Sequence, residues 1–154
     1  LKAYGVRDRG VWVMDSFQGL PPPSQEYPAD HGSAFHLQEE LRVDLAIVQG
    51  NFRRYDLYDE QVRFLPGWFR DTLPHALIDR LAILRIDADM YESTFTVLQE
   101  LYEKLSCGGF LIVDDYGALP ACRQAVEDFR KEHHITEPII PIDWTGIAWC
   151  KEGQ

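Results

Sequence analysis

Two short apolar runs, each followed at once by aspartates, constrain this chain more than any other feature. Residues 81–86 are followed by Asp87 and Asp89, and residues 110–113 are followed by Asp114 and Asp115. Short runs rich in branched apolar residues are typical of strands buried in a parallel sheet. In open α/β sheets the ligand site lies just beyond the carboxyl ends of such strands. The pattern therefore predicts a functional site built from carboxylates.

Carboxylates gathered at one point repel each other unless a cation neutralises them. Side chains alternate along a strand, so Asp87 and Asp89 should point to the same side. Of Asp114 and Asp115, at most one shares that face unless the strand ends between them. An all-oxygen ligand set matches Mg²⁺ better than zinc. The simpler alternative is that each aspartate caps the next helix or lies in solvent.

Composition excludes several classes of protein. The chain has 154 residues, 45% of them hydrophobic, and a net charge of −10. That length predicts one domain with a real core. The negative charge argues against nucleic acid or an anionic membrane as partner, and no apolar run is long enough to span a bilayer. Three cysteines without a CxxC pair argue against a disulfide framework or zinc site, so we expect a cytoplasmic protein.

Strands and helices alternate along the sequence. Residues 19–30, with three consecutive prolines at Pro21 to Pro23, cannot form a regular helix or a central strand. They are predicted to form a surface loop that extends through Ser33. Strands are predicted at 11–14, 62–65, 81–86, 110–113, 139–142 and 147–150. Helices are predicted at 39–55, with a break near Gly50 as an alternative, at 68–72, from the Ser93-Thr94 cap to the Gly108-Gly109 stop, and from Pro120 onward. This order predicts an α/β fold with a mostly parallel sheet and an antiparallel C-terminal hairpin strand.

Three further positions are candidates for a site. Asp15 ends a strand, where an acidic residue often binds the ribose hydroxyls of a nucleotide-like cofactor, although many strands end in Asp. Trp68 follows a Pro-Gly turn and could lie along an adenine ring or pack in the core. His36 could act as a general base, or it could be an exposed loop histidine. No serine-hydrolase elbow or phosphate-binding glycine loop is present.

Five stretches in the same order resemble the TylF/MycF family, the macrocin-type sugar O-methyltransferases of macrolide antibiotic biosynthesis. They are VWVMDSFQGLP (11–21), NFRRYDL (51–57), VRFLPGWF (62–69), RIDADMYEST (85–94) and GGFLIVDDY (108–116). The resemblance implies a Rossmann-like, class I methyltransferase fold that depends on S-adenosylmethionine (SAM) and Mg²⁺. It also implies that the first strand of that fold and its glycine-rich loop are missing from residues 1–154, a single N-terminally truncated domain.

Roles for individual residues follow only from this resemblance. It implies His36 as the catalytic base, Asp87, Asp114 and Asp115 as the metal ligands, and Asp15, Ser16, Gly67, Trp68 and Asp87 as cofactor-binding residues.

The expected reaction transfers a methyl group from SAM to a hydroxyl of a sugar or a sugar-bearing natural product, with Mg²⁺ assisting. The partner is then a small-molecule acceptor, and a homo-oligomer is also expected. One alternative is an inactive or incomplete methyltransferase fragment that binds no cofactor. A Mg²⁺-dependent phosphatase of the haloacid-dehalogenase type is a weaker alternative, because the gap between Asp89 and Asp114 is too short for that fold.

Overall fold

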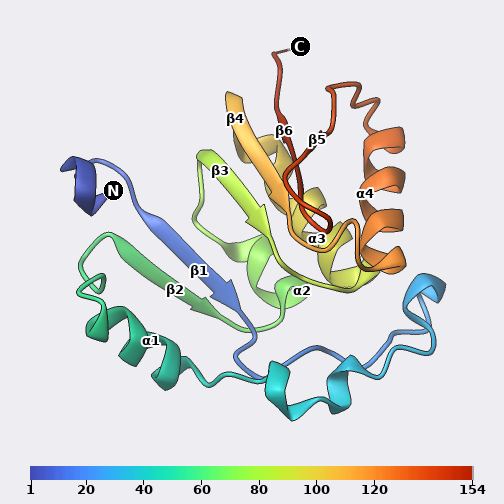
Figure 1. The fold of residues 1–154 in the computed structure, drawn as a ribbon, viewed down its shortest axis with the longest axis horizontal. Coiled ribbons are helices and arrows are strands. Elements are labelled where there is room, and N and C mark those ends of the chain that lie inside the picture. The colour runs from blue at the N-terminus through green and yellow to red at the C-terminus, as the bar shows by residue number, and fades with distance from the viewer. Residues whose placement is uncertain (154) are drawn as a thin grey trace. The chain divides into compact units, whose positions relative to one another are not determined.

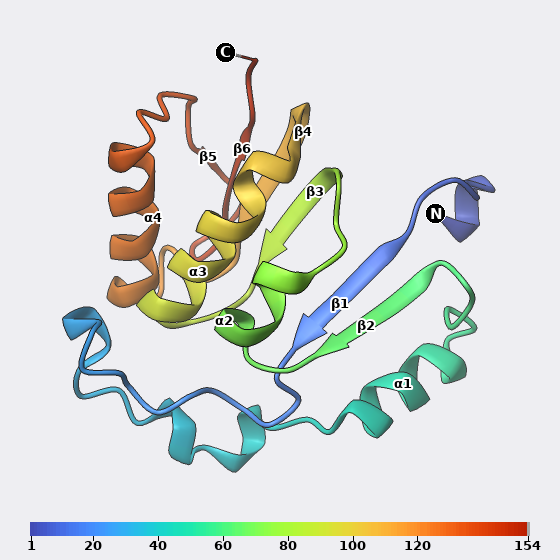
Figure 2. The same cartoon turned by 180° about the vertical axis from the view of Figure 1, so that it is seen from behind.

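The structure is a computed structural model that describes residues 1–153, and it divides into two compact units. Unit 1 comprises residues 1–22 and 33–72. Unit 2 comprises residues 23–32 and the described chain from residue 73 onward. Figures 1 and 2 show the elements of both units, which are described one at a time below.

Unit 1 is built on two parallel strands, β1 (Val11–Asp15) and β2 (Val62–Pro66). Their register runs from Val11 opposite Val62 to Asp15 opposite Pro66, so both carboxyl ends lie at the same edge. The Phe64 ring on β2 contacts the rings of Phe17, Phe52 and Tyr58. These aromatic contacts give the small unit an apolar centre.

The helices of unit 1 are shorter than the sequence predicts. Helix α1 covers Leu45–Arg54, and the short α2 covers Phe69–Thr72. The prediction of one helix over 39–55 is wrong at its start, because Glu39–Leu41 forms a separate 3₁₀ turn. Arg42 and Asp44 have ψ angles of 111° and 142°, outside the helical region, so the two segments cannot join.

The sheet of unit 2 has the strand order β3-β4-β6-β5. Its strands are β3 (Leu81–Ile86), β4 (Leu105–Val113), β5 (Ile140–Pro141) and β6 (Ile147–Cys150). Strands β3 and β4 are parallel, whereas β6 is antiparallel to both of its neighbours (Figure 1). The parallel strands and the antiparallel C-terminal hairpin therefore confirm the predicted fold class.

Two helices, α3 (Tyr91–Leu101) and α4 (Pro120–Glu132), supply the core of unit 2. The Phe129 ring on α4 contacts Phe95 of α3 and Tyr102, and Tyr102 also contacts Trp149 of β6. Fully buried apolar residues come from both helices and the sheet: Leu98, Leu101, Leu111, Val113, Ala125, Val126 and Trp149. This core fixes the strand ends on which the candidate site is built.

Two predicted boundaries in unit 2 are wrong. Helix α3 begins at Tyr91, so Ser93 and Thr94 lie inside its first turn instead of capping it. Strand β4 begins at Leu105, and its register against β3 shifts before Phe110. The glycine pair at 108 and 109 therefore belongs to an irregular strand and does not end the helix. Within residues 1–153, no helix is long and apolar enough to cross a membrane.

Candidate functional site

The carboxyl ends of β3 and β4 bring the two aspartate pairs to one edge of the sheet in unit 2. The two strands are parallel neighbours in register, with Ile86 opposite Val113. Just beyond, the Asp114 backbone N–H donates to the Ile86 carbonyl at 3.0 Å. We call the side chains of Asp87, Asp89, Asp114 and Asp115 the carboxylate edge.

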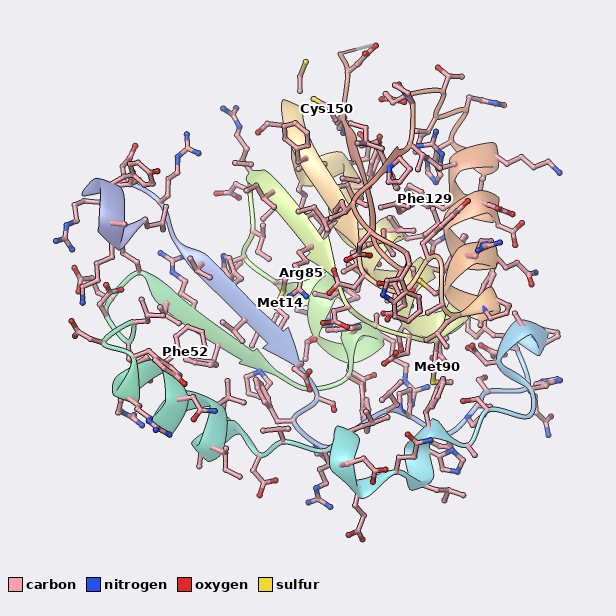
Figure 3. The ribbon with its side chains drawn as sticks, in the orientation of Figure 1. Met14, Phe52, Arg85, Met90, Phe129 and Cys150 are labelled. Carbon is pink, nitrogen blue, oxygen red and sulfur yellow. The ribbon has the colours of Figure 1, made fainter. Side chains whose placement is uncertain are left out.

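The negative charge of one half of the carboxylate edge, Asp87 and Asp114, is partly offset by an arginine that lies on β3 itself. The Arg85 Nε donates to Asp114 Oδ1 at 3.2 Å, and Nη2 donates to Asp114 Oδ2. The same Nη2 donates to Asp87 Oδ2 at 3.3 Å. Figure 3 labels Arg85 at the end of its strand. Neighbouring carboxylates, above all Asp114, raise the pKa of Arg85, so the guanidinium bridges both strands as a cation.

The other half has no such cation. Asp89 takes the left-handed backbone region with φ 58°, which is uncommon for a residue other than glycine. Burial, with the charges of Asp115 and Asp87, raises the pKa of Asp89 to about 6. Burial and the nearby Asp87 also raise the pKa of Asp115, whose buried Oδ2 has no hydrogen-bond partner. The charge of Arg85 lowers the pKa of Asp115, but burial and the neighbouring carboxylates outweigh it, so negative charge on this side of the edge is only partly compensated.

The arrangement in this structure is not that of a preformed metal centre. Among the described residues, no group of three or more His, Cys, Asp or Glu side chains lies close enough together to hold a metal ion. Asp87 and Asp114 are instead held by Arg85. The three predicted ligands, Asp87, Asp114 and Asp115, lie at one edge of the sheet, and their metal role stays a prediction.

The cysteines take no part in a metal site or disulfide. Cys107, Cys122 and Cys150 are all free. Cys122 is buried on α4, and burial, with Asp115 and Asp89 nearby, raises the pKa of its thiol to about 12. Burial and the raised pKa keep this thiol protonated, which argues against a reactive nucleophile at this position.

A buried carboxylate from the long loop holds the start of α3. Asp30 ends the short 3₁₀ turn Pro28–Asp30 and is only 2% exposed. Its Oδ1 accepts from the Tyr91 N–H at 2.7 Å, and its Oδ2 accepts from the Glu92 N–H at 2.9 Å. The segment 23–32 is thereby fixed to the helix that directly follows Asp89.

The carboxyl ends of β1 and β2 form a second edge, in unit 1. Asp15 and Gly67 meet there, because the Gly67 N–H donates to the Asp15 carbonyl at 2.9 Å. The Asp15 carboxylate accepts from the Phe17 N–H at 2.6 Å, and the Ser16 hydroxyl donates to the Gly19 carbonyl at 2.7 Å. We call Asp15, Ser16, Gly67 and Trp68 the turn edge. The structure thus brings these predicted cofactor-binding residues together.

Gly67 is required by the geometry of this turn. Its φ is 137°, and a Cβ there would lie 2.6 Å from Cγ2 of Thr72. Trp68 follows it and is half-buried. His36 lies in the 3₁₀ turn Phe35–Leu37 of unit 1 and is exposed.

The sequence gives no site role to two residues of the site, Arg85 and Asp30. Arg85 is predicted only as part of a strand, although alternation places it on the same side as Asp87 two residues later. Asp89 belongs to the predicted aspartate pattern, but the family resemblance assigns it no role. Asp30 carries no local signal, because its hydrogen-bond partners lie 61 and 62 residues away.

Comparison with known proteins identifies first the class and then the family. The structure of the O-methyltransferase NovP superposes on this chain with a TM-score of 0.96 and 51% sequence identity. The match covers 99% of this chain and 64% of the NovP chain. The fold is therefore that of the Rossmann-like methyltransferases. Residues 1–151 match the Macrocin-O-methyltransferase (TylF) family, and the chain belongs to that family.

Two curated relatives are similarly close. Demethyldecarbamoylnovobiocin O-methyltransferase of Streptomyces niveus is 52% identical over 151 residues, and mycinamicin III 3''-O-methyltransferase of Micromonospora griseorubida is 52% identical over 153. Both matches cover 97% of this chain. The chain spans only 58% and 60% of the lengths of these relatives.

Proposed function

We propose that this protein transfers a methyl group from SAM to a hydroxyl of a sugar or a sugar-bearing natural product. The observation that carries the proposal is the match to the macrocin O-methyltransferase family over residues 1–151. Relatives at 52% identity are named for methylation of demethyldecarbamoylnovobiocin and mycinamicin III. We also propose a place in antibiotic biosynthesis, supported by the acceptors that these relatives are named for.

The turn edge is the proposed cofactor site. Asp15 and Ser16 would hold the ribose hydroxyls of SAM, and Gly67 with Trp68 would lie against the adenine. The support is chemical: a carboxylate that ends a parallel strand can accept hydrogen bonds from two vicinal hydroxyls. The half-buried indole of Trp68 offers an apolar surface beside a turn that admits no larger residue than Gly67.

The carboxylate edge is the proposed Mg²⁺ site, with Asp87, Asp114 and Asp115 as ligands. The donor atoms are all oxygens, and a buried Asp115 oxygen is left without a hydrogen-bond partner. Burial, with the charges of Asp115 and Asp87, raises the pKa of Asp89, so a cation bound at this edge would offset the repulsion between the carboxylates. When bound, Mg²⁺ would orient the acceptor and lower the pKa of its hydroxyl group. Asp87 is also proposed to contribute to cofactor binding.

His36 is the proposed general base. The acceptor oxygen would form a bond to the methyl carbon of SAM as the carbon–sulfur bond breaks with its electrons going to sulfur. S-adenosylhomocysteine would leave, and the hydroxyl proton would go to the His36 imidazole. Holding the acceptor oxygen, carbon and sulfur in line can supply about 7–11 kcal/mol of the barrier.

Three further properties remain proposals. Residues 1–154 would belong to a single methyltransferase domain. The three free cysteines support a reducing, cytoplasmic location. A homo-oligomer is proposed as well, and sedimentation of the purified protein would test it.

The experiment is a methyl-transfer assay on this chain with SAM, Mg²⁺ and either demethyldecarbamoylnovobiocin or mycinamicin III. Formation of S-adenosylhomocysteine together with a methylated acceptor supports the proposal. A folded chain that binds S-adenosylhomocysteine but methylates neither acceptor would point to a different acceptor. A folded chain that binds no cofactor would favour the incomplete-fragment alternative.

A further inference from the structure

The two halves of the carboxylate edge differ in a way that the family assignment does not explain. Asp87 and Asp114, which end different strands, are joined by one guanidinium. Among residues 1–153, no ion pair to Asp89 or Asp115 is found, although the charge of Arg85 lowers the pKa of Asp115, and an Asp115 oxygen is buried without a partner. The positive charge therefore lies on the more exposed half of the edge.

Arg85 contacts two of the three carboxylates that the proposed function assigns to Mg²⁺. A guanidinium that donates from both Nε and Nη2 to one carboxylate takes up the lone pair of each oxygen that faces it. A divalent cation that approached Asp114 from the same side would need those lone pairs. Arg85 and a metal ion therefore compete for that side of Asp114.

The Arg85 side chain can also move away from Asp87 and Asp114. Its side chain is 58% exposed, that of Asp87 is 57% exposed and that of Asp114 is 29% exposed. Ion pairs this exposed are worth little and exchange readily with water. The long aliphatic stem can carry the guanidinium into solvent without unfolding the strand.

We propose that Arg85 is a built-in competitor of the metal, bridging Asp87 and Asp114 across β3 and β4 and swinging away when a divalent cation binds there. The proposal rests on the Mg²⁺ role given under Proposed function. It explains why the described side chains form no preformed metal group although four aspartates lie at one edge. It also gives Arg85 a function in the metal-free state, since its charge offsets repulsion between the strand ends.

The test is calorimetric titration of Mn²⁺ alone, as the probe metal, into the metal-stripped chain. Arg85→Ala should bind Mn²⁺ about 3- to 10-fold more tightly than the wild type, the effect expected for release of two exposed ion pairs. Arg85→Lys keeps the charge but loses the planar fork, so its affinity should fall between the two. Arg80→Ala is the matched control, because it removes an equal charge from an exposed residue just before β3 and should leave Mn²⁺ affinity unchanged.

The outcomes separate this inference from the proposed function. If the wild type binds Mn²⁺ and Arg85→Ala binds it no more tightly, the competitor role is wrong, whereas the proposed metal site stands. An equal gain in Arg80→Ala would also overturn it, because general electrostatics would then suffice. If neither the wild type nor a folded Arg85 variant binds Mn²⁺, the metal site of the proposed function is itself wrong. Should Arg85→Ala fail to fold, the Arg85→Lys titration decides the question alone.

Discussion

The turn edge and the carboxylate edge occupy the same position in two parallel strand pairs but use aspartate in opposite ways. Asp15 is engaged by its own turn, since it accepts from the Phe17 N–H two residues later. On β3 and β4, Asp89 and Asp115 repel each other, and burial raises the pKa of both. A carboxylate engaged locally suits a neutral polyol such as ribose, whereas crowded carboxylates suit a cation. An aspartate at the carboxyl end of a parallel strand is therefore not enough to tell whether the site binds a ribose or a cation.

The largest effect on activity is expected from removing the Asp115 carboxylate, whose buried oxygen has no hydrogen-bond partner and is proposed to bind the cation. Asp115→Asn should lower methyl transfer by about 100-fold or more, because a lost ligand forfeits several kcal/mol of charge stabilisation. Removal of the metal with EDTA should have the same effect on the wild type, and excess Mg²⁺ should restore it. The measurement is the rate of S-adenosylhomocysteine formation. Full activity in EDTA would contradict the proposal that the carboxylate edge, unlike the turn edge, binds a cation.

The next effect tests what holds the carboxylate edge in place. Asp30→Ala leaves the Tyr91 and Glu92 N–H groups without their acceptor in a buried position. The free energy of unfolding should fall by about 2–4 kcal/mol. Asp30→Asn keeps one acceptor oxygen and should lose about half as much. Urea titration followed by circular dichroism measures both, with the exposed Asp79→Ala as a control that should change little.

The turn edge can be broken by a single methyl group. Gly67→Ala combines a φ of 137° with a Cβ placed 2.6 Å from the Thr72 side chain. We expect a loss of about 1–3 kcal/mol in the free energy of unfolding. Gly50→Ala is the matched control, since Gly50 lies within α1 with open space around it. That variant should gain about 0.5–1 kcal/mol, so equal losses in both would contradict the account.

The smallest effect is a pH dependence beside the carboxylate edge. Burial and the nearby Asp128 raise the pKa of Tyr91 from 10.0 to about 12. The folded state therefore holds the phenolic proton more tightly than the unfolded state does. The stability that Tyr91 contributes is complete below pH 10 and is lost as the pH rises toward 12. Tyr91→Phe should flatten that part of the stability curve, and an unchanged slope between pH 10 and 12 would refute the shift.

The sequence predicts the strands of this fold better than it predicts where helices begin and end. Residues 81–86 are found as a strand because a branched apolar run can be recognised locally. The start of α3 is missed, since its cap comes from Asp30 and not from the neighbouring Ser93. The glycine pair at 108 and 109 is assigned to a helix end because the same residue also allows an irregular strand.

The candidate site shows the same limit. Its residue types follow from the sequence and the family resemblance, and parallel pairing then explains how Asp87 and Asp114 reach one edge. The bridge from Arg85 could have been found by the same alternation that grouped Asp87 with its strand. The unpaired oxygen of Asp115 could not, because burial and hydrogen-bond geometry appear only in three dimensions.

The most direct test of the central claim is a double titration that addresses the two edges separately. S-adenosylhomocysteine and Mn²⁺ are each titrated into the wild type, Asp15→Asn and Asp114→Ala. The account predicts that Asp15→Asn loses affinity for S-adenosylhomocysteine and keeps Mn²⁺, whereas Asp114→Ala loses Mn²⁺ and keeps S-adenosylhomocysteine. If both variants lose the same ligand, or if a folded wild-type chain binds neither, the division into a cofactor edge and a cation edge is wrong.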